Sequence, residues 1–169
     1  MADEAWEPVP DYERFWTPFD ERYAFRPNPS RSPPPGITEP SDSVTFSLAP
    51  IYSRVPSVTE DLINDAVLTA FLQVFDERER LIVLDWQHTS YWFRPHVHAS
   101  TETEWQVTPV PDGDYYSFLS EDMWSGTFGH PWEGTICVFG RELVDALAPT
   151  LSTLLPIIRR GGVAPGPAS

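Results

Sequence analysis

Apolar residues recur at helical spacing between positions 58 and 75, and this is the clearest pattern along the chain. The apolar positions are Ile63, Ala66, Val67, Ala70, Phe71 and Val74. They fall every three or four residues and so share one face of a helix, while polar residues occupy the rest. Ser57 and Glu60 have the spacing of a capping box at its start. We therefore expect a helix over residues 58–75 that packs its apolar face on a sheet.

Alternating apolar and polar positions predict short strands on either side of this helix. Residues 43–48 alternate, and residues 81–87 form an apolar run that turns polar at its end. Further strands are expected at residues 91–94, 104–108, 115–119 and 135–139, separated by turn signals such as PDGD and WEG. Together they predict an antiparallel meander. Within the run at 81–87, Asp85 and Gln87 should project to one side and Trp86 to the other, with Leu84.

The remaining segments predict two more helical regions and a loop. Residues 11–26 place Tyr12, Phe15, Trp16 and Phe19 on one face, and Pro18 is expected to break or end that helix. Residues 27–42 hold too many prolines for a helix or a central strand, so we expect an extended surface loop. A second main helix is expected over residues 141–158.

That second main helix should be kinked or broken near Pro149, and Gly161 and Gly162 should stop it. The tail at residues 161–169 is expected to be disordered. Residues 1–160 then form one domain, which suits a chain of 169 residues. We expect an α+β fold, with a curved antiparallel sheet of about five or six strands. Its two main helices should pack on one face and leave the other face open.

Composition removes several classes of function. The eleven basic residues are all arginine, and without lysine there is no Schiff base, no amine nucleophile and no phosphate-loop lysine. A net charge of −14 argues against nucleic acid as a ligand, although it suits a basic protein partner as well as it suits simple solubility. The one cysteine, Cys137, lies in the apolar run TICVFG and is expected to be a buried, inert thiol.

Other signals bear on location and cofactors. The longest apolar run is far short of a membrane span, so no membrane association is expected. The N-terminus begins acidic and lacks the apolar stretch of a secretory signal, which makes cytoplasmic residence the default. The sequence shows no glycine-rich nucleotide loop, CxxC pair or GxSxG elbow. Any enzyme here is therefore expected to need no cofactor.

Three segments combine polar and aromatic residues densely: LDWQHTSYWF, PDGDYYSF and GTFGHPWEGTICVF. Such a mixture suits a pocket that holds an apolar ligand while a few polar groups act on it. The succession of these segments resembles a bacterial family catalogued as domain of unknown function 2716. The opening DYERFWTPFDERYAFRP resembles that family's opening too, so the resemblance covers most of the chain. It implies no catalytic residues, because that family is uncharacterised.

Asp85 and His88 are the first candidate pair. Three residues apart at a strand end, they suit a carboxylate that orients an imidazole base, or equally a structural turn. In PDGDYY, Asp114 with Tyr115 and Tyr116 follows a tight turn. Tyr116 or Tyr115 is a candidate polarising phenol, although strand packing explains each of them as well.

GHPWE supplies the second candidate group. His130 and Glu133 flank a proline-stiffened turn and suit an acid or base, while Trp132 suits a flat wall for substrate. An ordinary hairpin whose Trp caps the core explains the same residues. The predicted catalytic residues are thus His88, Asp85, His130, Glu133 and Tyr116. The predicted substrate-binding residues are Trp86, Tyr91, Asp114, Tyr115, Trp124 and Trp132.

The histidines offer a further candidate, a metal site. His96 and His98 would alternate on a strand and, with His88 or Asp85, supply three ligands for zinc or iron. A short His-x-His on an edge strand is more often simply exposed, so no metal is expected.

Two functions follow from these residues. The first is a small cofactor-independent enzyme that acts on a large, partly apolar small molecule by acid–base chemistry beside a carbonyl. Dehydration or conjugate addition fits best, with ring closure as an extension. A fainter resemblance to small stand-alone tailoring enzymes of natural-product pathways, tied to no motif, implies a role in natural-product biosynthesis. The alternative is a non-enzymatic acidic binding protein, such as an immunity protein that covers a basic toxin. The enzyme requires the three segments to converge on one pocket.

Overall fold

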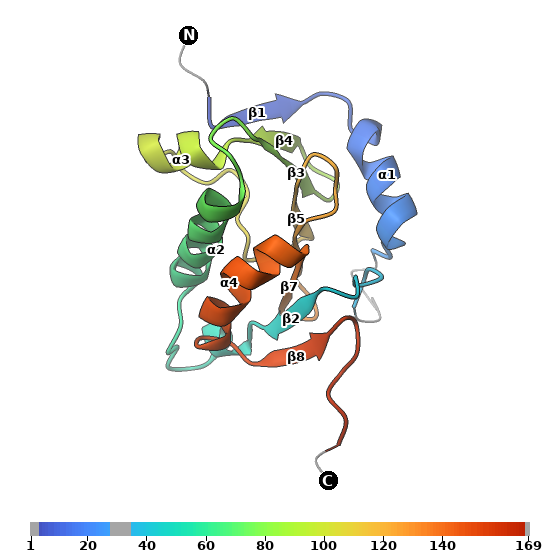
Figure 1. Cartoon of the computed structure of the whole chain (residues 1–169), viewed down its shortest axis with the longest axis vertical. Helices are drawn as coiled ribbons and strands as arrows, with labels where there is room; N and C mark the ends of the chain where they lie inside the picture. The colour runs from blue at the N-terminus through green and yellow to red at the C-terminus, as the bar shows by residue number, and fades with distance from the viewer. Residues whose placement is uncertain (1–3, 28–34, 168–169) are drawn as a thin grey trace.

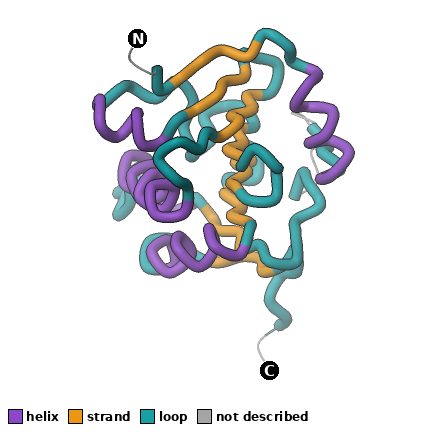
Figure 2. The backbone as a smooth tube through the Cα atoms, turned by 45° about the horizontal axis from the view of Figure 1, so that its top comes forward, coloured by secondary structure: helices purple, strands orange, loops and turns teal. Residues whose placement is uncertain are grey.

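The computed structural model describes residues 4–27 and 35–167, and its centre is one antiparallel sheet of eight strands (Figures 1 and 2). The strands are β1 (Trp6–Val9), β2 (Val44–Ser47), β3 (Leu81–Asp85), β4 (Ser90–Phe93), β5 (Tyr116–Leu119), β6 (Gly126–His130), β7 (Thr135–Phe139) and β8 (Ile157–Arg160). Their order is β1-β4-β3-β5-β6-β7-β2-β8, and every pairing is antiparallel. The sheet is curved, as expected, and it is unclosed, but it has more strands than the five or six predicted.

The helices are α1 (Glu13–Tyr23), α2 (Glu60–Val74), α3 (Pro95–Thr101) and α4 (Arg141–Ser152), with a short 3-10 turn η1 (Ala49–Tyr52). Helices α2 and α4 pack on each other and on one face of the sheet, as predicted. Helix α1 lies on the opposite face (Figure 1). None of the described helices has the length and apolar content to cross a membrane.

The second face of the sheet is therefore covered, contrary to the open face predicted. Phe15, Trp16 and Phe19 of α1, with Phe25 and Ile37 that follow it, bury their side chains against that face. Pro18 does not end the helix, which continues to Tyr23. Two apolar cores thus sandwich the sheet, one under α2 and α4 and one under α1. The predicted loop at 27–42 falls partly on residues 28–34, which lie outside the described residues.

Three strands were missed because their local signals are weak. Pro8 interrupts β1, and it is tolerated there because β1 lies at the sheet edge. Glycines dilute the β6 pattern, and Gly126 is needed because an added Cβ would meet the Phe118 carbonyl oxygen at 2.0 Å. The first two β8 residues, Ile157 and Ile158, fall within the helix predicted over 141–158. That helix passes Pro149, ends at Ser152 and is followed by a strand that pairs with β2.

Several local predictions are corrected. Residues 104–108 form a loop rather than a strand, and Asn64 of α2 holds that loop by accepting the Val110 N–H at 2.9 Å. The N-cap of α2 is Thr59 rather than Ser57, with its hydroxyl accepting the Leu62 N–H at 3.2 Å. Cys137 is buried, as expected, and burial raises the pKa of its thiol. Of the predicted disordered tail, residues 161–167 are described, and residues 162–167 are exposed; residues 168–169 lie outside the described residues.

Candidate functional site

The three predicted segments meet at one end of the sheet. Asp85 at the end of β3 pairs with Tyr116 at the start of β5, and Tyr116 pairs with Gly129 near the end of β6. Neighbouring strands lie about 4.8 Å apart, so residues on three adjacent strands in this row lie close together. Because side chains alternate along a strand, the residues next to this row point to one face of the sheet or to the other. Trp86 packs against the α1 core with Leu84, as predicted, while Asp85 faces the other way.

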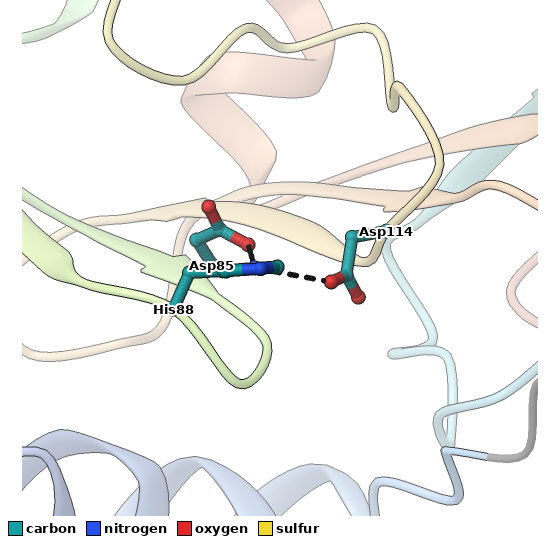
Figure 3. A group of neighbouring side chains, drawn as sticks. All are labelled: Asp85, His88 and Asp114. Carbon is teal, nitrogen blue, oxygen red and sulfur yellow. Dashed lines mark hydrogen bonds and ion pairs between the residues drawn. The ribbon is translucent and has the colours of Figure 1, made fainter.

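Asp85, His88 and Asp114 form a compact cluster at this end (Figure 3). His88 Nδ1 lies 3.0 Å from Asp85 Oδ1 and 3.2 Å from Asp114 Oδ2. A tight turn with Gln87 at a φ of 66° brings His88 back toward Asp85, and the His88 N–H donates to the Asp85 carbonyl at 3.1 Å. Asp114 is fixed in turn, because its Oδ1 accepts the Tyr115 N–H at 2.8 Å. The imidazole is thus held from two loops.

The cluster is half-buried on its carboxylate side and open on its imidazole side. The side chains of Asp85 and Asp114 are 15% and 14% exposed, while that of His88 is 64% exposed. The hydrogen bond and charge of Asp85 raise the pKa of His88 above its usual range. Burial raises the pKa of both carboxyl groups more than His88 lowers it. The pair of carboxylates therefore stabilises a proton on His88 Nδ1.

This geometry sets the tautomer of His88. With Nδ1–H donating toward the carboxylates, Nε2 carries the lone pair on the exposed side of the ring and can accept or return a proton. The same three groups could hold a divalent metal ion, because their ligand atoms lie within 4.8 Å of one another. A metal at Nδ1 would take the place of that proton. The absence of a metal stays a prediction.

Tyr12 belongs to this site, although its sequence pattern predicted only a place on a helix face. Its hydroxyl accepts the Gln87 N–H at 3.3 Å, one residue from His88. Burial raises its pKa, with the charges of Asp114 and Asp85 adding to the shift. The phenol therefore keeps its proton at neutral pH and can donate it. The contact spans 75 positions of sequence. The one signal available was that Tyr12 lies in the opening segment that resembles the family.

Two other predicted tyrosines have their main contacts outside the cluster. Tyr116 is paired with Asp85, and burial raises its pKa to about 12. Its hydroxyl donates to the Asp112 carbonyl at 3.0 Å, so its proton is already used within the turn. Tyr91 lies on β4, one strand beyond β3, and its ring meets Trp6 edge-on at 5.7 Å. The Tyr116 hydroxyl is therefore not placed as the polarising group.

On the α1 face, the aromatic residues of the three segments form a continuous wall. The Tyr115 ring is buried and contacts Trp86 at 5.6 Å, His130 at 4.9 Å and Trp132 at 5.0 Å. Trp132 is 45% exposed and lies at one end of this wall. His130 itself is only 1% exposed, and burial lowers its pKa. Its Nδ1 accepts the Glu133 N–H at 3.0 Å. His130 is thus held in the core beside the wall.

Glu133 is bound in a separate ion-pair network. Arg159 of β8 donates to Glu133 Oε1 at 2.6 Å and to Glu39 Oε1 at 2.7 Å. Thr135 also donates to Glu133, at 2.7 Å. Burial raises the pKa of Glu133, but the hydrogen bonds from Arg159 and Thr135 outweigh it, and the net pKa is lowered. The structure therefore places Glu133 with Arg159 and Glu39 rather than with the His88 cluster.

The remaining candidates lie away from the site. Trp124 is in the loop between β5 and β6, at the opposite end of the sheet from His88. His96 and His98 lie on α3 rather than on a strand. A ring nitrogen of His96 contacts the Phe75 carbonyl at 2.8 Å, and His98 Nδ1 accepts the Trp6 indole N–H at 3.3 Å. Each histidine thus has a structural partner, which corrects the strand-based ligand set.

A groove of about 380 Å³ adjoins the cluster on the α1 side. Tyr12, Trp16, Phe25 and Trp86 supply aromatic surface to it. Tyr12 therefore connects the groove to the turn that carries His88. The groove contains neither His88 nor His130 among its described lining residues. Hence the predicted segments meet at one end of the sheet, but the two histidines do not share this groove.

Comparison with known proteins places the chain within a family. Residues 8–144 match the family described as "Protein of unknown function (DUF2716)", and the chain belongs to that family. It is also similar to the uncharacterized protein YxiI of Bacillus subtilis (strain 168), with 38% identity over 98 residues. That alignment covers 57% of this chain and 60% of the relative. No solved structure is significantly similar to the chain.

Proposed function

We propose that this member of the DUF2716 family is a small cofactor-independent enzyme that moves protons beside a carbonyl of a large, partly apolar small molecule. Dehydration or conjugate addition, with ring closure as an extension, fits a role in natural-product biosynthesis. The observation that carries the proposal is His88, whose Nδ1 lies between two carboxylates while its ring stays exposed. Such an arrangement is what a general base requires.

Each group of the site has a role in this chemistry. His88 Nε2 removes a proton from the carbon next to the carbonyl and returns one later. Asp85 and Asp114 fix the tautomer and stabilise the imidazolium that forms. Tyr12, which stays protonated because its pKa is raised, donates a hydrogen bond to the developing enolate oxygen. These steps need only proton transfers, so no lysine is required.

The aromatic surface next to the cluster supports binding of an apolar substrate. Trp86 directly precedes the His88 turn, and its ring lines the groove that Tyr12 also enters. A volume of about 380 Å³ lies within the range of sites for drug-sized ligands. A substrate lying along Trp86 would reach the cluster past the Tyr12 hydroxyl.

The test is exchange of carbon-bound protons with solvent. Wild-type protein is incubated in deuterated water with a panel of aryl and alkyl ketones, and loss of the proton signal next to the carbonyl is followed by NMR. We expect exchange above the buffer rate for at least one ketone, because enolate formation is the first step of each reaction proposed. Exchange at the buffer rate across the panel would count against the enzyme.

A second candidate function has a specific observation in its favour. Trp124 is 65% exposed, and the guanidinium of Arg22 lies 3.7 Å from the centre of its ring. Asp122 holds the loop by accepting the Trp124 N–H at 3.0 Å and the Ser120 hydroxyl at 2.6 Å. The loop thus presents an aromatic ring firmly to solvent. Exposed Trp and Arg are favoured anchors of protein interfaces.

The surroundings of Trp124 favour a basic partner. A hollow of about 350 Å³ includes Trp124 in its wall, together with the carboxylates Asp42, Glu79, Asp122 and Glu142. The net charge of −14 would speed association with a cationic protein. This surface supports the alternative of an acidic binding protein, such as an immunity protein against a basic toxin. It lies far from the His88 cluster, so the two functions are separable.

Trp124→Ala is expected to abolish stoichiometric capture of a basic protein when the chain is used as bait in bacterial extract. Loss of such an anchor costs at least about 2 kcal/mol, or roughly thirtyfold in affinity. Trp132→Ala, at the other end of the sheet, is the matched control and should capture normally. Capture should also fall steeply as salt is raised. Equal loss in both variants, or no basic partner at all, would contradict the binding function.

A further inference from the structure

The groove beside the His88 cluster combines aromatic rings with negative charge. Four rings contribute to its lining, and they contact one another in sequence. Tyr12 and Trp16 stack at 5.6 Å, Trp16 and Phe25 lie 5.3 Å apart, and Phe25 meets Trp86 edge-on at 6.4 Å. Tyr12 and Trp86 are only partly buried, so their rings remain accessible from the groove.

Carboxylates form the rim of the same groove. Glu13, Asp20 and Glu21 of α1 all line it, and all three are exposed. Among the described lining residues there is no arginine or histidine. The carboxylates Asp85 and Asp114 lie just beyond Tyr12, close enough to raise its pKa. The groove therefore combines aromatic rings with a negative local field and has no described cation of its own.

We propose that this groove binds a cationic organic group, a quaternary or protonated amine, carried by the substrate. Aromatic faces attract cations through the negative charge above the ring, and rings grouped around a site recognise alkylammonium ions. A rim of carboxylates adds attraction at longer range. The inference rests on the proposed function only in taking the groove as the place where the substrate binds. The His88 cluster, which Tyr12 joins to the groove through its contact with Gln87, is then the reacting centre.

The position of Tyr12 links recognition to chemistry. Its ring stacks on Trp16 inside the groove, while its hydroxyl contacts the turn that carries His88. A substrate whose cationic head lies among the rings would therefore extend its carbonyl toward His88. The substrate class that follows is an amphipathic amine with a carbonyl a few bonds from the nitrogen.

The test compares two probes of the same shape and different charge. Choline and its uncharged carbon isostere dimethylbutanol are titrated into the wild-type protein, with the indole N–H signals followed by NMR. Choline is expected to bind at least about tenfold more tightly than the isostere, because a partly desolvated cation–π contact is worth about 1–2 kcal/mol. Equal affinities, or no binding of choline, would overturn the proposal.

Substitutions in the groove test whether choline binds there. Trp86→Leu should weaken choline binding about tenfold, in line with loss of one cation–π contact. The double variant Asp20→Asn with Glu21→Gln changes only exposed residues, so it should stay folded, and it should weaken binding and reduce its salt dependence. Tyr52→Leu is the control and should bind normally, because Tyr52 is exposed and does not line the groove. Unchanged binding in both groove variants would show that choline binds elsewhere and would reject this groove.

One further variant separates this inference from the proposed function. His88→Gln removes the base but no described groove residue, so choline should bind it as tightly as it binds the wild type. Choline binding without any ketone exchange in the wild type would reject the acid–base function and leave the cation site standing. Ketone exchange in the wild type without choline binding would reject the cation site and leave the acid–base function standing.

Discussion

Replacing Arg159 with leucine is expected to lower the free energy of unfolding by about 3–5 kcal/mol, because the change leaves two buried carboxylates without their cation. The side chains of Glu39 and Glu133 are 1% and 10% exposed, and Arg159 is 13% exposed. Arg159 makes two hydrogen bonds to each carboxylate, at 2.6–3.1 Å. Since a domain is stable by only about 5–15 kcal/mol, the loss is a large fraction of the total.

Urea unfolding followed by circular dichroism measures this loss. Glu7→Gln is the matched control, because Glu7 is exposed and its pair with Arg94 is long, at 3.8 Å. Breaking such a surface pair should cost at most about 1 kcal/mol. Adding Glu39→Gln and Glu133→Gln to Arg159→Leu should restore part of the stability, because neutral amides are less costly to bury than charges. A single Arg159→Leu variant as stable as Glu7→Gln would contradict this account of the network.

His88→Gln is expected to lower the rate of ketone exchange by about 100- to 10,000-fold, the usual contribution of general acid–base catalysis. Glutamine keeps a polar group near the two carboxylates but has no basic nitrogen. His96→Gln is the control, because His96 contacts the Phe75 carbonyl rather than the candidate site. His130→Gln should also keep exchange activity wherever it folds, since His130 is buried apart from the groove. NMR exchange rates measure all three.

The pH dependence follows from the direction of the pKa shift. Only the neutral imidazole can act as base, so activity should rise with pH through the pKa of His88 and then level off. Asp85 raises that pKa, which places the rise above the usual range of histidine. Asp85→Asn should therefore shift the rise to lower pH and reduce the maximum rate.

The opposite shift, to higher pH, would contradict the role given to Asp85.

A chelator provides a further check on the cluster. Because the mechanism proposed uses only protein groups, EDTA should leave exchange unchanged. Loss of exchange in EDTA would instead assign Asp85, His88 and Asp114 to a metal ion.

Sequence patterns that lie within a single helix or strand predicted the structure correctly. The apolar stripe of α2 includes Ile63, Val67 and Phe71, and all three are fully buried where the helix meets the sheet. The apolar run at residues 81–87 likewise predicted a central strand, and the alternating direction of its side chains placed Trp86 on the same side as Leu84. These signals are local, because helix and strand periodicity depends on side-chain direction alone.

Edge strands and the covered second face were not predictable in the same way. β8 had joined a helical pattern because its apolar residues continue the spacing of α4, and only pairing with β2 decides otherwise. In α1, Pro18 argued for a break, but Phe15, Trp16 and Phe19 are buried against the sheet and hold the helix together across it. Tertiary burial outweighed local propensity in both places.

For the candidate site, sequence alone singled out the residue types and the segments that carry them. Asp85 and His88 meet as their spacing predicted, because a three-residue turn is a local structure. Asp114 and Tyr12 join them from other segments, and Glu133 instead joins Arg159, 26 positions away. Which partner a charged or phenolic group takes depends on strand order and register. Those depend on the packing of the whole chain, so only the tertiary structure decided which of the candidates share a site.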